Sequence, residues 1–134
     1  MVTAPAMFQK RERIVSRKLM DELFGGDHSH AVVAFPLKAV YMVKEHPDGQ
    51  APVEVLISVP KKHFKHAVDR NRVKRQVREA YRKQKQLLIN GLGSEKKLAV
   101  AFIWMSDQKI TSEEVDGRIK NILTRIAKKV EVSV

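Results

Sequence analysis

The sequence contains no cysteine among its 134 residues. A disulfide framework and a thiolate zinc site are therefore excluded, and with them the zinc fingers and zinc ribbons. Glycine and proline are also scarce, and the six glycines and five prolines are too scattered to mark an interdomain linker. We find no internal repeat, so we expect one domain over residues 1–134, with residues 1–12 as an irregular N-terminal arm.

Long apolar runs are missing as well. No segment approaches the roughly 18 to 20 apolar residues that a membrane-spanning helix needs. The opening MVTAPAMFQKRER has no apolar stretch of signal-peptide length before its charges. We therefore expect a cytoplasmic protein that has no membrane partner.

Acidic residues are scarce in one segment in particular. Residues 61–85, KKHFKHAVDRNRVKRQVREAYRKQK, hold 11 Lys and Arg against two acids, which supplies +9 of the formal net charge of +11. The rest of the chain holds 15 basic and 13 acidic residues and is nearly balanced. Such a local excess repels itself unless a partner neutralises it, which favours a polyanionic ligand over a merely solvated helix face.

The hydrophobic pattern predicts an α/β protein with the element order αββαβα. A first amphipathic helix begins near Ser16 and ends at the Gly25-Gly26 pair, and strands are expected over 31–44, 53–59 and 98–105. Pro36 lacks a ladder donor, which indicates an edge position or a bulge in the first strand. A last helix is expected from Thr111 or Ser112, with its inner side formed by Val115, Ile119, Ile122, Leu123, Ile126 and Val130.

The basic segment is predicted to form a long helix with two different sides. The side expected to pack holds Val68, Val73, Val77, Ala80, Tyr81 and Leu88, and a second side repeats Arg70, Lys74, Arg78 and Arg82 every four residues. Arg presents a planar fork of donors to phosphate oxygens and Lys a point charge, so this pattern suits a sugar-phosphate surface. The candidate residues for binding a sugar-phosphate backbone are Lys61, Lys62, Arg70, Asn71, Arg72, Lys74, Arg75, Arg78 and Arg82.

Residues for protein-based hydrolysis are poorly represented. His63 and His66 form an HxxH pair, but no cysteine or clustered carboxylate completes a metal site. Asp69 and Glu79 lie in a basic field without a third partner for Mg²⁺. We expect neither catalytic residues nor a metal site in this chain, and we expect Trp104, the only tryptophan, to be a core residue.

The segment VPKKHFKHAVDRNRVKRQVREAYR, residues 59–82, strongly resembles the signature of the bacterial ribonuclease P protein component. The matching positions are Lys61-Lys62, Ala67-Val68, Arg70-Asn71-Arg72, Lys74-Arg75 and Arg78-Glu79. The segment FQKRERI, residues 8–14, resembles the opening of the same family. The resemblance implies an α+β sandwich, like a known ribosomal protein domain, with a mainly antiparallel central sheet and a rare left-handed strand–helix–strand crossover.

The resemblance also implies a function. The chain would be the protein subunit of a ribonucleoprotein endonuclease that removes the 5′ leader from precursor tRNA. The catalytic groups and most Mg²⁺ sites would belong to the ribonuclease P RNA, which the basic helix would contact. A cleft between the first helix and the sheet would hold the single-stranded leader. The positions that match this leader cleft are Arg13, Arg17, Met20, Phe24 and Lys38.

Several alternatives stay open. Met20 stands where many members of the family have an aromatic residue, and both Met20 and Phe24 have an alternative interpretation as core residues. Phe35 and Tyr41 of the first strand are further candidates for the cleft wall. A ribosomal RNA-binding protein of similar architecture is the second hypothesis for the whole chain. A DNA-binding regulator is poorly supported, because nothing resembles a helix-turn-helix, and DNA is not an expected partner.

Overall fold

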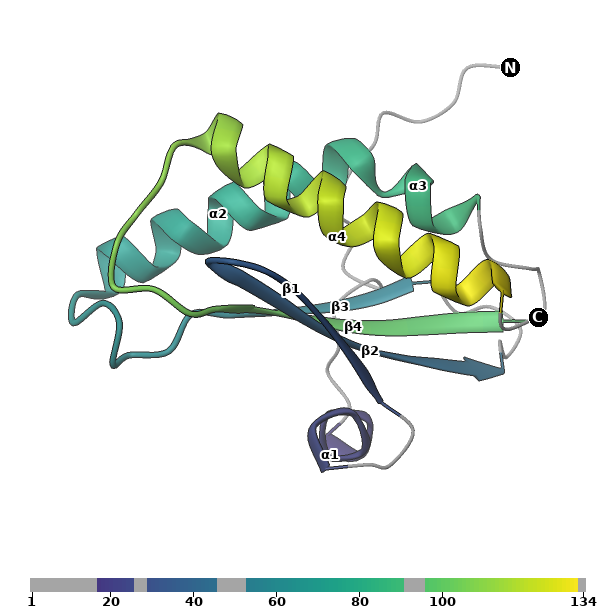
Figure 1. Ribbon diagram of the computed structural model, residues 1–134. Coiled ribbons are helices and arrows are strands. Elements are labelled where there is room, and N and C mark those ends of the chain that lie inside the picture. The colour runs from purple at the N-terminus through teal and green to yellow at the C-terminus, as the bar shows by residue number, and fades with distance from the viewer. Residues whose placement is uncertain (1–16, 26–28, 46–52, 91–95, 133–134) are drawn as a thin grey trace, which may run out of the picture.

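The computed structural model describes residues 17–25, 29–45, 53–90 and 96–132. The elements run in the order α1 (Arg17–Gly25), β1 (His30–Ala34), β2 (Leu37–Glu45), β3 (Val53–Ser58), α2 (Ala67–Gln84), α3 (Gln86–Ile89), β4 (Lys96–Trp104) and α4 (Ser112–Val132). Helices α2, α3 and α4 cover one face of the sheet, which we call the helical face, and α1 lies on the opposite α1 face (Figure 1). Within the described ranges, no helix is long and apolar enough to cross a membrane.

The strands form one mixed sheet in the order β1-β2-β4-β3. The pairs β1/β2 and β2/β4 are antiparallel, whereas β3/β4 is parallel. Strand β4 is buried almost along its whole length, as its continuous apolar sequence predicts for a central strand. The predicted α/β class with a mainly antiparallel sheet is confirmed. The connection from β3 through α2 and α3 to β4 is the crossover whose left hand stays a prediction.

The single strand expected over 31–44 is wrong. The chain reverses at Phe35 and Pro36, which are joined by a cis peptide bond, and forms the antiparallel hairpin of β1 and β2. Proline has no N–H to donate to a ladder, so it ends the strand here instead of occupying an edge position or a bulge within it. The carbonyl oxygen of Pro36 instead accepts a 2.8 Å hydrogen bond from the backbone N–H of Met105, which fixes the turn against the end of β4.

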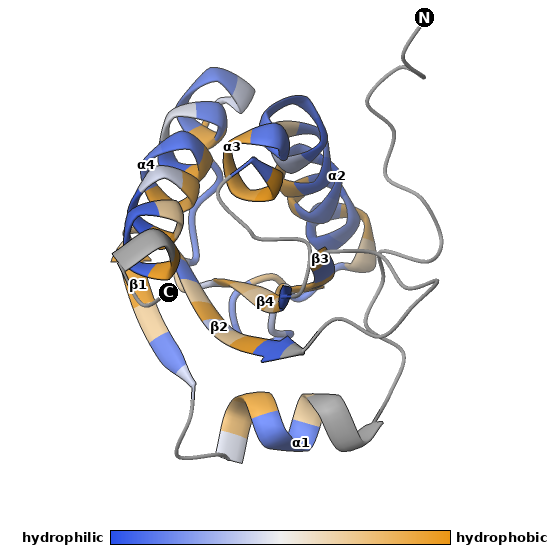
Figure 2. Ribbon diagram, turned by 90° about the vertical axis from the view of Figure 1, so that its right-hand side faces the viewer, coloured by the Kyte–Doolittle hydropathy of each residue, from blue (hydrophilic) through white to orange (hydrophobic). Residues whose placement is uncertain are grey.

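The main core lies on the helical face. The α4 residues predicted to face inward are all buried, and Trp104 is fully buried, which confirms that it is a core residue. Figure 2 shows the hydrophobic sides of α3 and α4 turned inward and α2 as a mostly hydrophilic ribbon.

Two expectations about buried and exposed residues are corrected. Tyr41 is only 2% exposed on this face, where burial raises the pKa of its hydroxyl, so it is not a wall residue of the leader cleft.

The second correction concerns Val68, which is 78% exposed. The buried positions of α2 are Val73, Gln76, Val77, Ala80 and Tyr81, which form one helical stripe. One turn before Val73, this stripe passes through positions 69 and 70, because a helix repeats every 3.6 residues. Val68 therefore lies beside the stripe and faces solvent.

A smaller cluster holds α1 on the other face. Leu23 is fully buried against Met42, Ala99 and Ala101, and Met20 packs at the edge of the same cluster. An ion pair of 2.8 Å between Lys44 of β2 and Glu22 of α1 adds a polar contact. The α1 helix is therefore placed by side chains that alternate with those of the main core along β2 and β4.

Candidate nucleic-acid interface

The basic segment begins in a loop, residues 59–66, that precedes α2. Phe64 is buried and anchors this loop in the main core. The guanidinium of Arg70 donates hydrogen bonds to the carbonyl oxygens of Phe64, at 2.8 Å, and Lys65, at 3.1 Å. Arg70 therefore fixes the loop onto the first turn of the helix, while Lys61 and Lys62 extend from the loop and are exposed.

The outer side of α2 exposes Asn71, Arg72 and Arg75. The predicted row of Arg70, Lys74, Arg78 and Arg82 is half-buried, because these residues lie beside the stripe that packs against the core. Arg82 also binds Glu79 of its own helix at 2.9 Å. The centre of the exposed basic surface is therefore the pair Arg72 and Arg75, and the row of four forms its margin.

The two acids of the basic segment are already paired with bases. Asp69 accepts a 2.7 Å hydrogen bond from Lys109, and this bond lowers the pKa of Asp69, with smaller contributions from the charges of Lys109, His66 and Arg72. Glu79 is bound by Arg82. Carboxylates engaged in this way are poor Mg²⁺ ligands, and the described residues contain no group of three His, Cys, Asp or Glu side chains suited to a metal ion.

The histidines do not form a shared site in the described part of the chain. The Nδ1 atom of His63 lies 2.7 Å from a carboxylate oxygen of Asp107, whereas His66 is exposed at the start of α2. His30 packs its ring against Tyr41, with the ring centroids 5.5 Å apart. His28 and His46 lie outside the described residues.

The candidate leader residues lie on the α1 face where they are described. Phe24 is 51% exposed, so it is not a buried core residue, whereas Met20 is half-buried in the smaller cluster. Lys38 lies on the same side of β2 as Val40, which packs in the cluster of Met20. Arg13 and the side chain of Arg17 fall outside the described residues.

A second basic surface, on α4, was not predicted. The exposed residues Arg118, Lys120, Arg125 and Lys128 belong to a stretch, 118–129, that contains no acidic residue. Two of them bind backbone: Arg118 donates to the carbonyl oxygen of Phe35 at 2.9 Å and Arg125 to that of Val33 at 2.8 Å. The absence of acidic residues from 118–129 could have predicted this surface from the sequence. Residues 61–85 carry most of the net positive charge, so the overall charge balance alone does not point to α4.

Known proteins resemble this chain in sequence and in fold. A family model described as ribonuclease P matches residues 8–127. The ribonuclease P protein component of Porphyromonas gingivalis strain ATCC 33277 is 40% identical over 131 residues, which cover 94% of this chain and 92% of the relative. That of Chlorobaculum tepidum is 43% identical over 82 residues, which cover 56% of this chain and 53% of the relative.

Solved structures agree in fold. The ribonuclease P protein of Staphylococcus aureus superposes with a TM-score of 0.65 at 20% identity and covers 87% of this chain and 95% of its own. That of Thermotoga maritima superposes with a TM-score of 0.60 at 20% identity and covers 82% and 94%. With a family match along nearly the whole sequence, the chain belongs to the ribonuclease P protein family and is a subunit of the ribonucleoprotein enzyme that processes tRNA.

Proposed function

We propose that the loop of residues 59–66 and the outer side of α2 bind the RNA subunit of ribonuclease P. The observation that carries this proposal is the uncompensated charge of α2. Arg72 and Arg75 are exposed, and no described carboxylate pairs with either of them, since Asp69 and Glu79 are bound by other bases. Guanidinium groups presented in this way bind phosphate oxygens with paired hydrogen bonds.

The protein contributes position and charge to the reaction. Its bases neutralise phosphates, so that the folded RNA holds its reactive groups and the substrate in a tighter geometry. Mg²⁺ stabilises the attacking and leaving oxygens of phosphodiester hydrolysis. Because the acids of α2 do not fit a Mg²⁺ site, we assign these ions mainly to the RNA, and we assign no catalytic residue to the protein.

The α1 face is proposed to hold the 5′ leader of precursor tRNA. The half-exposed ring of Phe24 offers a stacking surface to an unpaired base, and Lys38 offers a charge for the leader backbone. Met20 is partly buried in the smaller cluster that holds α1 on the sheet, and its exposed part offers a thioether contact to the leader. Stacking and backbone contacts tolerate many sequences, which suits an enzyme that processes every tRNA.

Reconstitution at low Mg²⁺ tests the RNA contact. Purified protein added to an in vitro transcribed ribonuclease P RNA should increase 5′ maturation of a precursor tRNA. The variant Arg72→Ala/Arg75→Ala should increase it less, whereas Lys120→Ala/Lys128→Ala removes the same charge from α4 and serves as the matched control. Cleavage by RNA-free protein, or no stimulation by the wild type, would overturn the proposal.

Leader length tests the α1 face. The reconstituted particle is titrated with precursor tRNAs that carry a long leader, a one-nucleotide leader or none. Phe24→Ala should weaken binding of the long-leader substrate alone, by about 1 to 3 kcal/mol for one stacked base. Leu87→Ala, which truncates another exposed apolar side chain, is the control. Equal loss on all three substrates would show that Phe24 has a structural role.

The alternatives have less support. A ribosomal RNA-binding protein has no reason to match the ribonuclease P family over residues 8–127, so this second hypothesis is not favoured. The DNA-binding hypothesis gains no support from the fold, in which α2 is held against the sheet by a buried stripe.

A further inference from the structure

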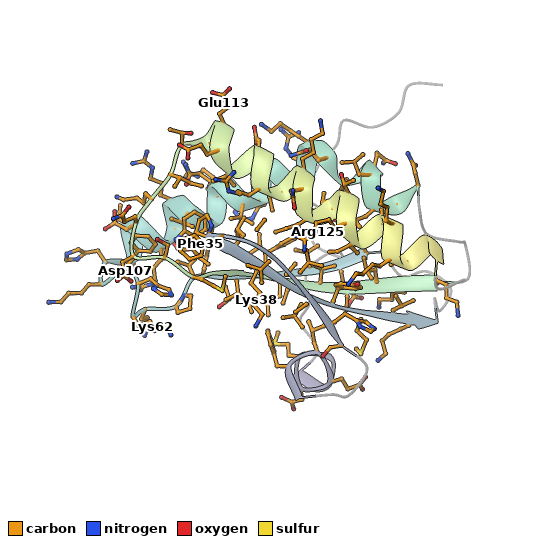
Figure 3. All side chains as sticks on the ribbon, viewed as in Figure 1. Phe35, Lys38, Lys62, Asp107, Glu113 and Arg125 are labelled. Atoms are coloured by element: carbon orange, nitrogen blue, oxygen red, sulfur yellow. The ribbon has the colours of Figure 1, made fainter. Side chains whose placement is uncertain are left out.

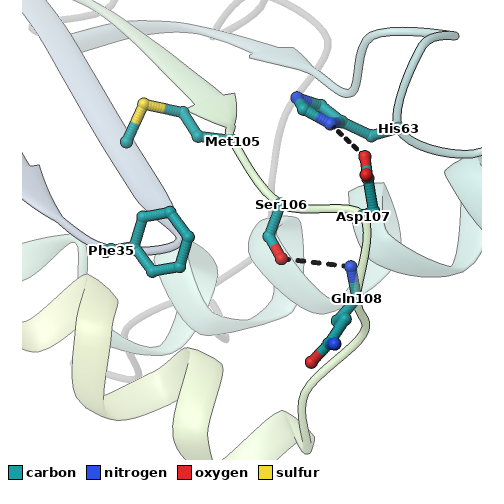
Figure 4. Close-up of a pocket in the computed structure, with 6 residues that line it drawn as sticks. All are labelled: Phe35, His63, Met105, Ser106, Asp107 and Gln108. Atoms are coloured by element: carbon teal, nitrogen blue, oxygen red, sulfur yellow. Dashed lines mark hydrogen bonds and ion pairs between the residues drawn. The ribbon is translucent and has the colours of Figure 1, made fainter.

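A cavity of about 430 Å³ opens at the end of the sheet where β4 finishes. Three segments that are distant in sequence line it: the β1–β2 turn, the loop before α2, and the loop between β4 and α4 (Figures 3 and 4). The lining residues are Phe35, His63, Met105, Ser106, Asp107 and Gln108. Of these residues, only His63 belongs to a surface proposed above, the loop of residues 59–66. Phe35, which the sequence offered as a further candidate for the leader-cleft wall, lies in the β1–β2 turn.

One wall of this cavity is aromatic and apolar. Phe35 is 62% exposed, and its ring stands beside Met105 at the mouth of the cavity (Figure 4). A large ring that remains this exposed at the edge of a polar hollow is a stacking surface for a flat ligand. Met105 adds a polarisable side chain next to it.

The opposite wall is polar and held in place. Asp107 binds the His63 ring at 2.7 Å, and the Ser106 hydroxyl oxygen accepts a 3.0 Å hydrogen bond from the backbone N–H of Gln108 (Figure 4). The Asp107 side chain is nevertheless 77% exposed, so its carboxylate has room to accept another donor. The bond from Met105 to Pro36 joins this loop to the turn that carries Phe35.

Positive charge lies beside the cavity in the loop before α2. Lys61 and Lys62 are exposed in the same loop as His63, and Figure 3 places Lys62 at the same end of the molecule as Asp107 and Phe35. A flat stacking surface, a fixed hydrogen-bond acceptor and adjacent cations together match the base, the base edge and the phosphate of one nucleotide.

We propose that this cavity binds a single unpaired RNA nucleotide, whose base stacks on Phe35 and whose amino group donates to Asp107. The proposal rests on the proposed function, since it requires that the chain binds RNA. A carboxylate only accepts hydrogen bonds, so it favours adenine, cytosine and guanine, which carry exocyclic amines. Uracil presents its one N–H between two carbonyl oxygens and is disfavoured. The nucleotide comes either from the RNA subunit or from the precursor tRNA leader, and the two sources share this chemistry.

Two binding measurements identify the source. The first is the affinity of the protein for ribonuclease P RNA, and the second is the affinity of the reconstituted particle for precursor tRNA with and without a long leader. If the nucleotide belongs to the RNA subunit, Phe35→Ala should weaken the first affinity by roughly 5- to 150-fold. If it belongs to the leader, Phe35→Ala should weaken the second affinity by the same factor, and only for the long-leader substrate. Phe35→Trp should restore binding, and Leu87→Ala should leave it unchanged. Unchanged binding by Phe35→Ala in both measurements overturns the proposal, as does an equal loss in Leu87→Ala.

Base preference gives an independent test that leaves Phe35 in place. Oligoadenylate and oligocytidylate should bind the wild-type protein more tightly than oligouridylate of the same length, and Asp107→Asn should reduce this difference. Equal binding of the three by the wild type, or an unaltered preference in Asp107→Asn, overturns the proposal. If the wild type neither binds ribonuclease P RNA nor stimulates cleavage, the proposed function itself has failed. If it does both while all cavity variants behave like wild type, only the cavity proposal has failed.

Discussion

Asp69 joins the start of α2 to the loop before α4. Its carboxylate accepts the 2.7 Å hydrogen bond of Lys109, and this bond is the main reason why the pKa of Asp69 lies below its ordinary value. The contact bridges two segments that lie 40 positions apart in sequence. It therefore helps to hold the first turn of the basic helix next to the loop that forms the cavity.

We expect Lys109→Met to raise the pKa of Asp69 toward the ordinary range, as measured by carboxyl carbon NMR titration. The folded pKa is depressed, so the contribution of this carboxylate to stability is full above the unfolded pKa, near 4, and is lost as pH falls through the folded value. The difference in unfolding free energy between wild type and variant should therefore shrink in acid. Lys120→Met is the control, and an unaltered titration of Asp69 would contradict the expectation.

At the scale of elements, α2 combines a buried stripe with an exposed basic side. If about 4 to 6 phosphates meet this surface, the logarithm of RNA affinity should fall with the logarithm of salt concentration by roughly 0.7 to 0.9 per phosphate. Arg72→Ala/Arg75→Ala should flatten this slope by about one to two units, with little change in stability because both side chains are exposed. An unaltered slope would mean that this side of α2 is solvated in the complex.

Strand β1 lies at an edge of the sheet and is contacted by arginine side chains of α4. It pairs only with β2 among the described strands. Arg125 donates to the carbonyl oxygen of Val33 within β1, and Arg118 donates to that of Phe35, directly after it. An uncovered strand edge is a template for pairing with another chain. We expect Arg118→Ala/Arg125→Ala to lose about 1 kcal/mol of unfolding free energy and to associate at high concentration.

Chemical unfolding and light scattering measure these two effects. Lys120→Ala/Lys128→Ala is the matched control, because it removes the same charge from α4 without a described contact to β1. If both double variants lose equal stability and neither associates, the arginine contacts do not protect the edge.

The sequence predicted some elements better than others. The continuous apolar run predicted β4 correctly, and the 3.6-residue repeat predicted α4 correctly. In both elements the buried residues are the ones that the pattern defines. The β1–β2 hairpin was missed because apolar residues continue through Phe35 and Pro36 without a glycine or asparagine turn signal. Val68 was misplaced by one position, since the periodicity alone does not fix where a buried stripe begins.

At the scale of the molecule, the surface proposed for the RNA subunit and the surface proposed for the leader lie on opposite faces of one sheet (Figure 1). The basic surface was predictable because its charge is local in sequence. Whether Phe24 or Met20 is exposed depends on how α1 packs on β2 and β4, which no local pattern determines. The cavity was not predictable, because it joins segments near residues 35, 63 and 106.

This separation predicts additive effects. The losses of binding free energy from Arg72→Ala/Arg75→Ala and from Phe24→Ala should sum, within about 0.5 kcal/mol, in the combined variant. The measurement is the total free energy of two successive binding steps, protein with ribonuclease P RNA and then the particle with long-leader precursor tRNA. A larger departure from additivity would show that the two surfaces are coupled through the sheet or through the bound RNA.

The strand order β1-β2-β4-β3 has a consequence for the newly made chain. The strand in contact with both β2 and β3 is β4, which is synthesised last of the four. On the ribosome, the β1–β2 hairpin, β3 and the basic helix therefore all emerge before the strand that joins them. The sheet cannot close until residues 96–104 have left the exit tunnel, so folding follows synthesis and depends on contacts distant in sequence. A stalled or truncated chain would expose a basic helix without the sheet that orients it.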